Sequence, residues 1–188
     1  MTSDAVSALA GRATSGWVTL RDLGLTGMIT LRGDLANAPL RALVQDITGQ
    51  EVPPPGRAYV HAMCGTAWMS PDEVLLLVPY DAAPAACARI AATLVDQHHL
   101  AANVSDARTV IALDGAGAAE LLAKLAPVDL HPDHFAPGQF RRTRLGQIAA
   151  AFWRDDGRFV VICFRSVAGY AFDLLARSAK DGPVGLFR

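Results

Sequence analysis

A glycine-containing turn is the first segment that could bind a cofactor. Gly115-Ala-Gly117-Ala-Ala-Glu120 follows a β-rich run and begins a helical pattern, as the turns that bind dinucleotides do. However, Glu120 stands where those turns have a third glycine, and no acid ends a second parallel strand about 20 residues later. We therefore interpret the segment as a tight turn between a strand and a helix.

One of the two histidine pairs in the sequence has residue types that could bind a metal ion. His131-Pro-Asp-His134 places two imidazoles and a carboxylate within one short segment. Its proline-broken spacing gives no defined tetrahedral or facial ligand set, and no third ligand cluster lies near it in sequence. We interpret it as a solvated loop. His98 and His99 end a predicted helix, where an imidazole is favoured near the negative end of the helix dipole.

No nucleophile in the sequence stands in a catalytic motif. There is no Gly-x-Ser-x-Gly elbow and no phosphate-binding loop with a lysine. Cys64, Cys87 and Cys163 are far apart and odd in number, which suits neither a disulfide framework nor a zinc site. We expect them to be small buried residues. The residues by themselves therefore predict no catalytic, cofactor-binding or metal-binding site.

Two acids and two tryptophans occur at matching places in the two halves of the sequence. Asp22 and Asp106 each precede a predicted first strand, and we interpret them as turn residues rather than as acceptors for a ligand amine. Trp68 and Trp153 each precede a hairpin turn. We expect them to be duplicated core residues rather than rings that stack on a cofactor.

Composition and charge limit the classes of partner. The 188 residues carry a net charge of −1 with arginines and acids interspersed, so no basic surface for nucleic acid is expected. No uncharged apolar stretch reaches the roughly 18 residues that a membrane-spanning helix needs. Met1–Arg12 has an early acid and no apolar core, unlike a secretory signal. The sequence therefore predicts a cytoplasmic protein with no role for nucleic acid or membrane.

The first half alternates strand and helix patterns. Gly27–Asp34 is a β-rich run that ends in a turn, and Leu40–Ile47 follows with helical spacing between Pro39 and Gly49. After a proline-rich break, Ala58–Met63 and the apolar run Val74–Val78 predict strands, the latter buried on both faces. A helical stripe from Asp81 to Val95 completes the order β-α-β-β-α.

The second half repeats this order. Arg108–Gly115 is again a β-rich run, and the helical stripe Ala118–Leu125 follows it. Leu145–Trp153 and Phe159–Phe164 predict two strands joined by a hairpin around Asp-Gly. A final helix, capped by Ser166, follows them.

The restart of the pattern determines the predicted fold class. We expect an α+β domain over residues 17–188, built from two pseudo-repeated units that pack together, with halves at about 17–105 and 106–188. Residues 1–16 are predicted to be a poorly ordered lead-in.

Four segments of the sequence resemble one known family. Trp68–Leu77, Asn103–Thr109, Val128–Gln139 and Phe164–Tyr170 are similar to the sarcosine oxidase gamma-subunit family, in the same order and spacing. The resemblance runs from about Val18 to about Ala179. It implies the folate-binding fold of the aminomethyltransferases, whose duplicated architecture matches the predicted repeat.

The resemblance also implies a function for the complex and a place for its cofactors. It implies partnership with alpha, beta and delta subunits in an enzyme that oxidises sarcosine to glycine and reduces oxygen to hydrogen peroxide. The one-carbon product is formaldehyde or methylene-tetrahydrofolate. FAD, FMN, NAD, tetrahydrofolate and zinc are then expected in the partner subunits, and this chain is expected to be non-catalytic and to hold no cofactor.

Two related functions remain as alternatives. The chain could be a free-standing folate-binding aminomethyltransferase-like protein or an iron-sulfur assembly factor. The assembly factors carry Lys-Gly-Cys-Tyr-x-Gly-Gln where this sequence has only Phe135-Ala-Pro-Gly-Gln139. The aminomethyltransferases carry an Asp-x-Ser context near the first strand, and Asp22-Leu-Gly24 lacks the serine. These departures argue against independent transfer chemistry.

One arginine-rich segment is the candidate contact with partner subunits. We expect a loop from Phe135 to Arg144, outside any predicted helix. Arginine and aromatic residues are enriched at protein interfaces, and a solvated basic turn is the alternative of equal weight. The candidate residues are Phe135, Gln139, Phe140, Arg141, Arg142 and Arg144.

Overall fold

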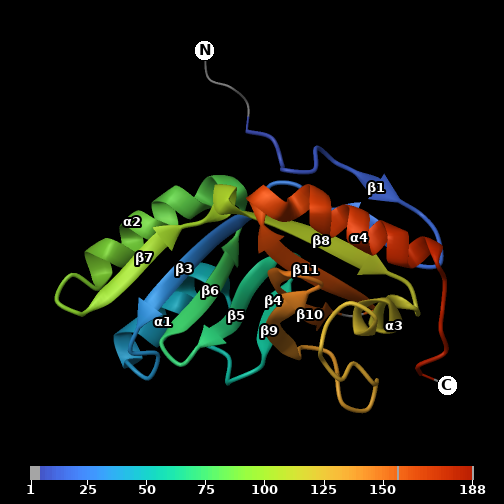
Figure 1. Cartoon of the computed structure of the whole chain (residues 1–188). Coiled ribbons are helices and arrows are strands. Elements are labelled where there is room, and N and C mark those ends of the chain that lie inside the picture. Colours follow the sequence, from blue (N-terminus) through green and yellow to red (C-terminus); the bar gives the residue numbers. More distant parts are fainter. Residues whose placement is uncertain (1–4, 156, 188) are drawn as a thin grey trace. The chain divides into compact units, whose positions relative to one another are not determined.

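The chain forms two compact units. The structure is a computed structural model that describes residues 5–155 and 157–187 (Figure 1). Unit 1 comprises Met1–Leu25 and Ala107–Arg188, and unit 2 comprises Thr26–Asp106. Each unit has one antiparallel sheet and two α-helices, which agrees with the predicted mixture of helices and strands.

Unit 2 is a five-stranded sheet with two helices. Its sheet order is β4-β5-β6-β3-β7, and all paired neighbours are antiparallel. Its elements along the chain are β3 (Gly27–Gly33), α1 (Ala38–Thr48), β4 (Ala58–His61), β5 (Cys64–Ser70), β6 (Glu73–Val78), the 3-10 turn η1 (Tyr80–Ala82), α2 (Ala83–Thr93) and β7 (His99–Asn103).

Local signals in the sequence account for the bounds of α1. The Asn37 side chain accepts a hydrogen bond from the backbone N–H of Leu40, and a proline occupies the first turn. Gly49 ends the helix in the left-handed conformation, with φ 71°. The predicted helix is therefore confirmed, with its ends at the residues that cap it.

The core of unit 2 lies between its helices and one face of its sheet. Both helices contribute apolar residues to the same cluster as alternate residues of β3 and β6. Every residue of β6 is buried, which confirms the prediction of a strand buried on both faces. The core residues are Ile29, Leu31, Leu40, Leu43, Val44, Val52, Val74, Leu76, Val78, Ala83, Ile90 and Leu94.

Unit 1 is a six-stranded sheet with two helices. Its sheet order is β1-β2-β8-β11-β10-β9, again antiparallel throughout. Its elements are β1 (Ala13–Thr14), β2 (Thr19–Asp22), the 3-10 turn η2 (Ser105–Ala107) at its border, β8 (Arg108–Asp114), α3 (Ala118–Ala123), β9 (Phe140–Leu145), β10 (Ile148–Asp155), β11 (Arg158–Phe164), the 3-10 turn η3 (Arg165–Val167) and α4 (Ala168–Lys180).

An aromatic cluster fills the core of unit 1. The ring centroid of Phe135 lies 5.9 Å from that of Phe152 and 5.7 Å from that of Phe159. These distances are typical of favourable aromatic pairs. The cluster packs with apolar residues of α3 and α4, among them Leu121, Phe172 and Leu175. The hairpin predicted between β10 and β11 is confirmed by their pairing from Asp155 with Arg158 to Ala150 with Cys163.

The unit boundary differs from the expected boundary between halves. Residues 17–25 lie in unit 1 because β2 pairs with β8, although they precede the first strand of unit 2. Part of the expected lead-in is also structured, since Leu9 is only 3% exposed and Ala13–Thr14 forms β1. Residues 1–4 of that lead-in lie outside the described residues.

Several strands were not predicted, namely β1, β2, β5, β7 and β9. β7 occupies the segment where the sequence indicated only a polar helix end. β9 occupies the second half of the expected loop between Phe135 and Arg144. The strand predicted from Leu145 to Trp153 is in fact the end of β9, a tight turn at Gly146 with φ 57°, and β10.

The two sheets have corresponding strand orders. Each strand of unit 2 corresponds to one strand of unit 1 when the order β4-β5-β6-β3-β7 is compared with β9-β10-β11-β8-β2. β7 and β2 therefore hold equivalent places, although β7 ends the first half of the chain and β2 begins it. The sheet of unit 2 ends at β7, whereas the sheet of unit 1 continues beyond β2 to β1.

No helix among residues 5–155 and 157–187 is both long and apolar enough to cross a membrane.

Candidate subunit-contact surface

The predicted contact segment is an edge strand rather than a loop. β9 is the last strand of its sheet and pairs only with β10. Phe135 and Phe140 are 0% and 1% exposed, so these two side chains belong to the core of this structure. Arg141, Arg142 and Arg144 are exposed, and Gln139 is half-buried. The available part of the candidate surface is therefore polar and basic.

Two arginines hold the chain before β9. The Arg141 guanidinium lies 5.5 Å from the centre of the Phe135 ring and donates to its own neighbour, the Phe140 carbonyl, at 2.8 Å. Arg154 Nη1 donates to the Phe135 carbonyl at 2.9 Å. Both arginines thus fix the position of Phe135, which is a structural role.

The other two arginines of β9 are available at the surface. Arg144 Nη2 donates to Gln147 Oε1 at 2.6 Å across the β9–β10 turn. Arg142 forms no ion pair or hydrogen bond through its side chain with any residue that the structure describes. Because residues two apart in a strand share a face, Arg142 and Arg144 present their charges on the same side of the sheet. Together they can receive carboxylates of another chain.

The glycine-containing turn has a structural cause. A Cβ atom on Gly117 would lie 2.3 Å from the Trp17 ring, so only glycine lets this indole pack on the turn. Glu120, which replaces the third glycine, accepts hydrogen bonds from the backbone N–H groups of Val184 and Gly185. The interpretation of this segment as a strand-to-helix turn is confirmed, and Glu120 additionally anchors the C-terminal tail.

The electrostatics of Glu120 follow from this anchoring. Glu120 is 8% exposed, and burial acts to raise the pKa of its carboxyl group. Backbone N–H donors of residues 184–186 and the nearby Lys124 ammonium outweigh burial, so the pKa lies below its ordinary value. Glu120 is therefore an ionised structural acceptor.

The Lys124 ammonium group also makes structural contacts. Its Nζ donates to the carbonyls of Ser178 and Gly182, both at 2.9 Å, near the end of α4. It also lies 5.2 Å from the centre of the Trp17 ring. A lysine at this place satisfies carbonyls that the helix end leaves without partners.

The histidine loop is held by its own residues. Asp129 accepts from the backbone N–H of His131 at 3.0 Å, and the Nδ1 atom of His134 is in hydrogen-bond contact with its other oxygen. These two contacts hold the pKa of Asp129 below its ordinary value. Among residues 5–155 and 157–187, no group of three or more His, Cys, Asp or Glu side chains is arranged to hold a metal ion.

Cys87 and Cys163 are not activated thiols. Burial raises the pKa of Cys163 to about 11 and also raises the pKa of Cys87. A thiol with a raised pKa is a poor nucleophile at neutral pH, because the thiolate is the reactive form. Cys163 is buried as predicted, whereas Cys64 and Cys87 are half-buried.

The two acids differ in their hydrogen-bond partners, and the two tryptophans differ in their burial. Asp22 accepts from the backbone N–H groups of Gly11 and Gly24, and Asp106 accepts from the Tyr80 hydroxyl at 2.9 Å. Asp22 is therefore a turn residue as predicted, and it also holds the N-terminal segment. Trp153 is 1% exposed, a core residue as predicted, but Trp68 is only half-buried.

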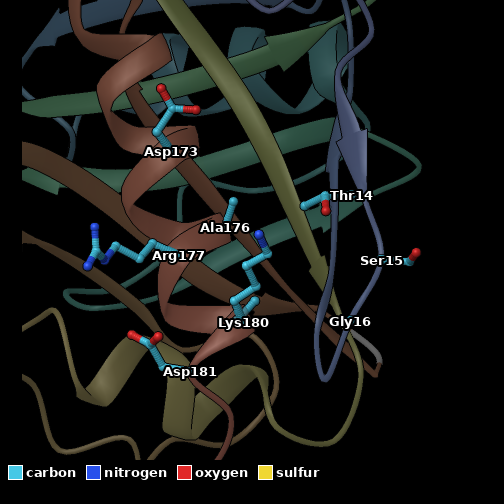
Figure 2. A pocket seen from close by; sticks show the side chains of 9 residues that line it. Thr14, Ser15, Gly16, Asp173, Ala176, Arg177, Lys180 and Asp181 are labelled. Atoms are coloured by element: carbon cyan, nitrogen blue, oxygen red, sulfur yellow. The ribbon is translucent and has the colours of Figure 1, made fainter.

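A hollow of about 660 Å³ lies between the N-terminal segment and α4 (Figure 2). Its lining mixes acids and bases, with Asp173 and Asp181 beside Arg177 and Lys180. Figure 2 shows that Arg177 and Lys180 extend in different directions from the helix. The charges do not converge on one point, so this hollow presents no site for a ligand of one sign.

Comparisons with known proteins agree with the resemblance in sequence. The model of the "Sarcosine oxidase, gamma subunit family" matches residues 32–180. Sarcosine oxidase subunit gamma of Corynebacterium sp. (strain P-1) is 31% identical over 149 residues, covering 78% of this chain and 72% of the relative. The corresponding protein of Arthrobacter sp is 30% identical over 149 residues, with the same two coverages of 78% and 72%.

Solved structures extend this similarity to the fold. A chain of the heterotetrameric sarcosine oxidase from Corynebacterium sp. U-96, in complex with pyrrole 2-carboxylate, matches with a TM-score of 0.78 and 26% identity, covering 89% of this chain and 87% of that one. The glycine cleavage system aminomethyltransferase T from Bartonella henselae matches with a TM-score of 0.59 and 16% identity, over 86% of this chain and 46% of that one, which shows a shared fold alone. The chain belongs to the sarcosine oxidase gamma subunit family.

Proposed function

We propose that this chain is the non-catalytic gamma subunit of a heterotetrameric sarcosine oxidase, together with alpha, beta and delta subunits. The observation that carries the proposal is the structural match to a heterotetrameric sarcosine oxidase chain, at a TM-score of 0.78 over most of both chains. The complex oxidises the N-methyl group of sarcosine, transfers the electrons to oxygen as hydrogen peroxide, and releases glycine. The one-carbon unit leaves as formaldehyde or as methylene-tetrahydrofolate.

The contacts of the polar residues support a structural role for this chain. Glu120 and Lys124 both hold the end of the chain, and Asp22 holds the N-terminal segment. Cys163 has a raised pKa and is buried. Residues that could have served chemistry are thus occupied by the fold, and FAD, FMN, NAD, tetrahydrofolate and zinc are assigned by this proposal to the partner subunits.

The basic face of β9 is the proposed contact with a partner. Arg142 and Arg144 are exposed, lie on one face and extend from a sheet edge. Their guanidinium groups suit carboxylates on a facing chain, because arginine binds carboxylates in a bidentate geometry. Gln139 borders this face, Phe140 is a buried residue on the same face of the strand, and Phe135 is buried before β9.

We propose that the two units are copies of one pattern. The sequence predicted the order β-α-β-β-α for each copy, but the structure has three strands rather than two between the helices, namely β4, β5 and β6 in unit 2 and β9, β10 and β11 in unit 1. Their sheets have corresponding strand orders, and Trp68 and Trp153 lie on the corresponding strands β5 and β10. β2 and β7 also hold corresponding places, since β2 pairs with β8 and β7 pairs with β3. This correspondence supports a duplication.

Co-purification tests the assignment. The tagged chain is purified from its native host, the recovered proteins are identified by mass spectrometry, and flavin absorbance is recorded. Recovery of a flavin-containing large subunit with two further chains is expected. Recovery of a lone, flavin-free protein that binds tetrahydrofolate would instead favour a free-standing enzyme. Cell fractionation of the same material tests the expected cytoplasmic location.

A charge reversal tests the contact surface. Arg142→Glu is expected to reduce the recovered partner at least tenfold, since it replaces attraction to carboxylates by repulsion. The matched control is Arg41→Glu, which changes an exposed arginine of unit 2 that forms no ion pair with a described residue. Equal recovery for both variants would show that the basic face of β9 is not the contact.

A further inference from the structure

The outer edge of β7 is a sheet edge without charge protection. β7 ends the five-stranded sheet and pairs only with β3 among the described residues. Its sequence His-Leu-Ala-Ala-Asn contains no acid, lysine or arginine. Leu100 in this strand is 53% exposed, and Val95 just before it is 72% exposed. Edge strands normally carry charges or prolines that prevent strand addition, and β7 has neither.

The backbone donors of this edge can be assigned from the ladder. The N–H of Val104 donates to the Met28 carbonyl at 2.8 Å. Because donors alternate along an antiparallel strand, the N–H groups of Ala102 and Leu100 face β3. Those of Ala101 and Asn103 consequently point away from the sheet, where a further strand would accept them.

The equivalent edge in unit 1 is covered by an extended segment. β1 pairs with β2, and the N–H of Asp22 also donates to the Arg12 carbonyl at 2.9 Å. This segment continues over α4, where the Arg12 guanidinium lies 4.4 Å from the centre of the Phe172 ring and 2.6 Å from a carboxylate oxygen of Asp173. α4 contacts β2, and β1 pairs with the edge of β2 that faces away from β8.

Unit 2 has the same arrangement without the covering segment. α2 contacts β7 as α4 contacts β2, and Figure 1 shows α2 running alongside β7. α2 and α4 can be aligned by their buried residues Ile90 and Leu175. In this alignment Cys87 corresponds to Phe172, and Ala88 corresponds to Asp173. The position beside β7 that corresponds to the Arg12 contacts is therefore lined by small uncharged side chains.

These side chains determine the chemistry of the occupant. Ala88, Ala91, Ala92 and Val95 are exposed on or just after α2, and the one charged side chain within the helix, Arg89, is paired with Asp46 of α1. An occupant that presented charged groups here would lose hydration without gaining a partner. Apolar side chains would instead cover Leu100 and Val95.

We propose that β7 pairs with an extended, apolar segment of a partner subunit, which adds a sixth strand to the sheet of unit 2 as β1 does in unit 1. The segment accepts hydrogen bonds from the N–H groups of Ala101 and Asn103 and covers Leu100 and Val95 with apolar side chains. This is strand addition to a sheet edge. The inference rests on the proposed function, because the segment comes from a subunit of the same complex.

Amide hydrogen exchange in the assembled complex tests the proposal. The wild-type chain is measured alone and after assembly with its co-expressed partners. The amides of Ala101 and Asn103 are expected to exchange at least tenfold more slowly in the complex. If the chain assembles but these amides exchange at an unchanged rate, the inference about β7 is wrong while the proposed function stands. Failure of the wild-type chain to assemble contradicts the proposed function itself.

Two variants separate strand addition from general destabilisation. Ala101→Pro removes one outward donor without removing a bond to β3, and Leu100→Lys places a charge in the apolar contact. Both are expected to weaken assembly at least tenfold with normal folding of the isolated chain. Leu186→Lys is the matched control, since Leu186 is also a leucine with 53% exposure. Assembly of both β7 variants at the wild-type level would overturn the proposal.

A second copy of this chain is the competing occupant. In that case Ala101 and Asn103 would become protected in the isolated chain as its concentration rises, with a matching increase in mass by light scattering. That result would overturn the assignment to a partner subunit.

Discussion

Unit 1 and unit 2 share a strand order but differ in their surfaces and edges. Unit 2 contains eight acidic and four basic residues, whereas unit 1 contains ten acidic and thirteen basic residues. The edge strand β9 carries three exposed arginines, and β7 carries no charge. One topology therefore supports two kinds of surface, because strand order is set by buried residues and the surface residues are free to diverge.

The edges differ in the kind of partner that they admit. Arginines at the edge of β9 oppose pairing with another strand and favour contacts through side chains. The uncharged edge of β7 favours pairing through the backbone. The proposed electrostatic contact of unit 1 and the proposed strand-addition contact of unit 2 both rest on this difference between the edges.

The matching tryptophans give the largest expected difference between the units. Trp153 is 1% exposed, so Trp153→Ala is expected to lower the free energy of unfolding by about 3–5 kcal/mol. Trp68 is half-buried, and Trp68→Ala is expected to cost about 1 kcal/mol. Urea unfolding of both variants measures the two values. Equal losses would contradict the different burial of the two rings.

Glycine substitutions test the turn that is specific to unit 1. Gly117→Ala forces a Cβ atom into the Trp17 ring and is expected to cost about 1–3 kcal/mol. Gly169→Ala in the first turn of α4 meets no atom within 4 Å and is expected to be neutral or stabilising by up to about 1 kcal/mol. Thermal unfolding distinguishes the two, and a stable Gly117→Ala variant would contradict the packing of Trp17 on this turn.

Acid is expected to release the C-terminal tail of unit 1 before the chain unfolds. The pKa of Glu120 is lowered in the folded chain, so its contribution is present above the ordinary Glu pKa of about 4.3 and is lost as the pH falls through the lower folded value. Amide exchange of residues 184–186, corrected for intrinsic rates, should accelerate in this range. Glu120→Gln should remove this pH dependence, and its persistence would assign the release to another group.

The smallest effect on stability is expected for the exposed arginine of β9. Arg142→Ala should change the free energy of unfolding by less than about 0.5 kcal/mol, since it removes no contact with a described residue. By contrast, Arg141→Ala should speed the amide exchange of residues around Phe135, because Arg141 lies against the Phe135 ring. A large loss of stability in Arg142→Ala would mean that this arginine is structural and would weaken its assignment to a partner contact.

The candidate site could be predicted only in part. The arginines of the segment 135–144 are exposed as its composition suggested, but Phe135 and Phe140 are buried. Aromatic residues serve interfaces and cores alike, so composition does not distinguish the two. The alternation of β9 was obscured because Arg141 and Arg142 are both exposed on an edge strand. Contact of any of these residues with a partner stays a prediction.

The sequence by itself determined the local elements and the family. Pro39 in the first turn and Gly49 at the C-terminal end mark α1. The Asp-Gly turn marks the hairpin of β10 and β11, and the apolar run of β6 marks a buried strand. Each signal acts within a few residues. Only the tertiary structure decided that β2 joins β8 and that β7 joins β3. It also decided that β1 covers the edge of β2, whereas no strand of residues 5–155 and 157–187 covers the edge of β7. These pairings join segments far apart in the chain, and short strands such as His99–Asn103 carry too few residues to specify a partner by periodicity.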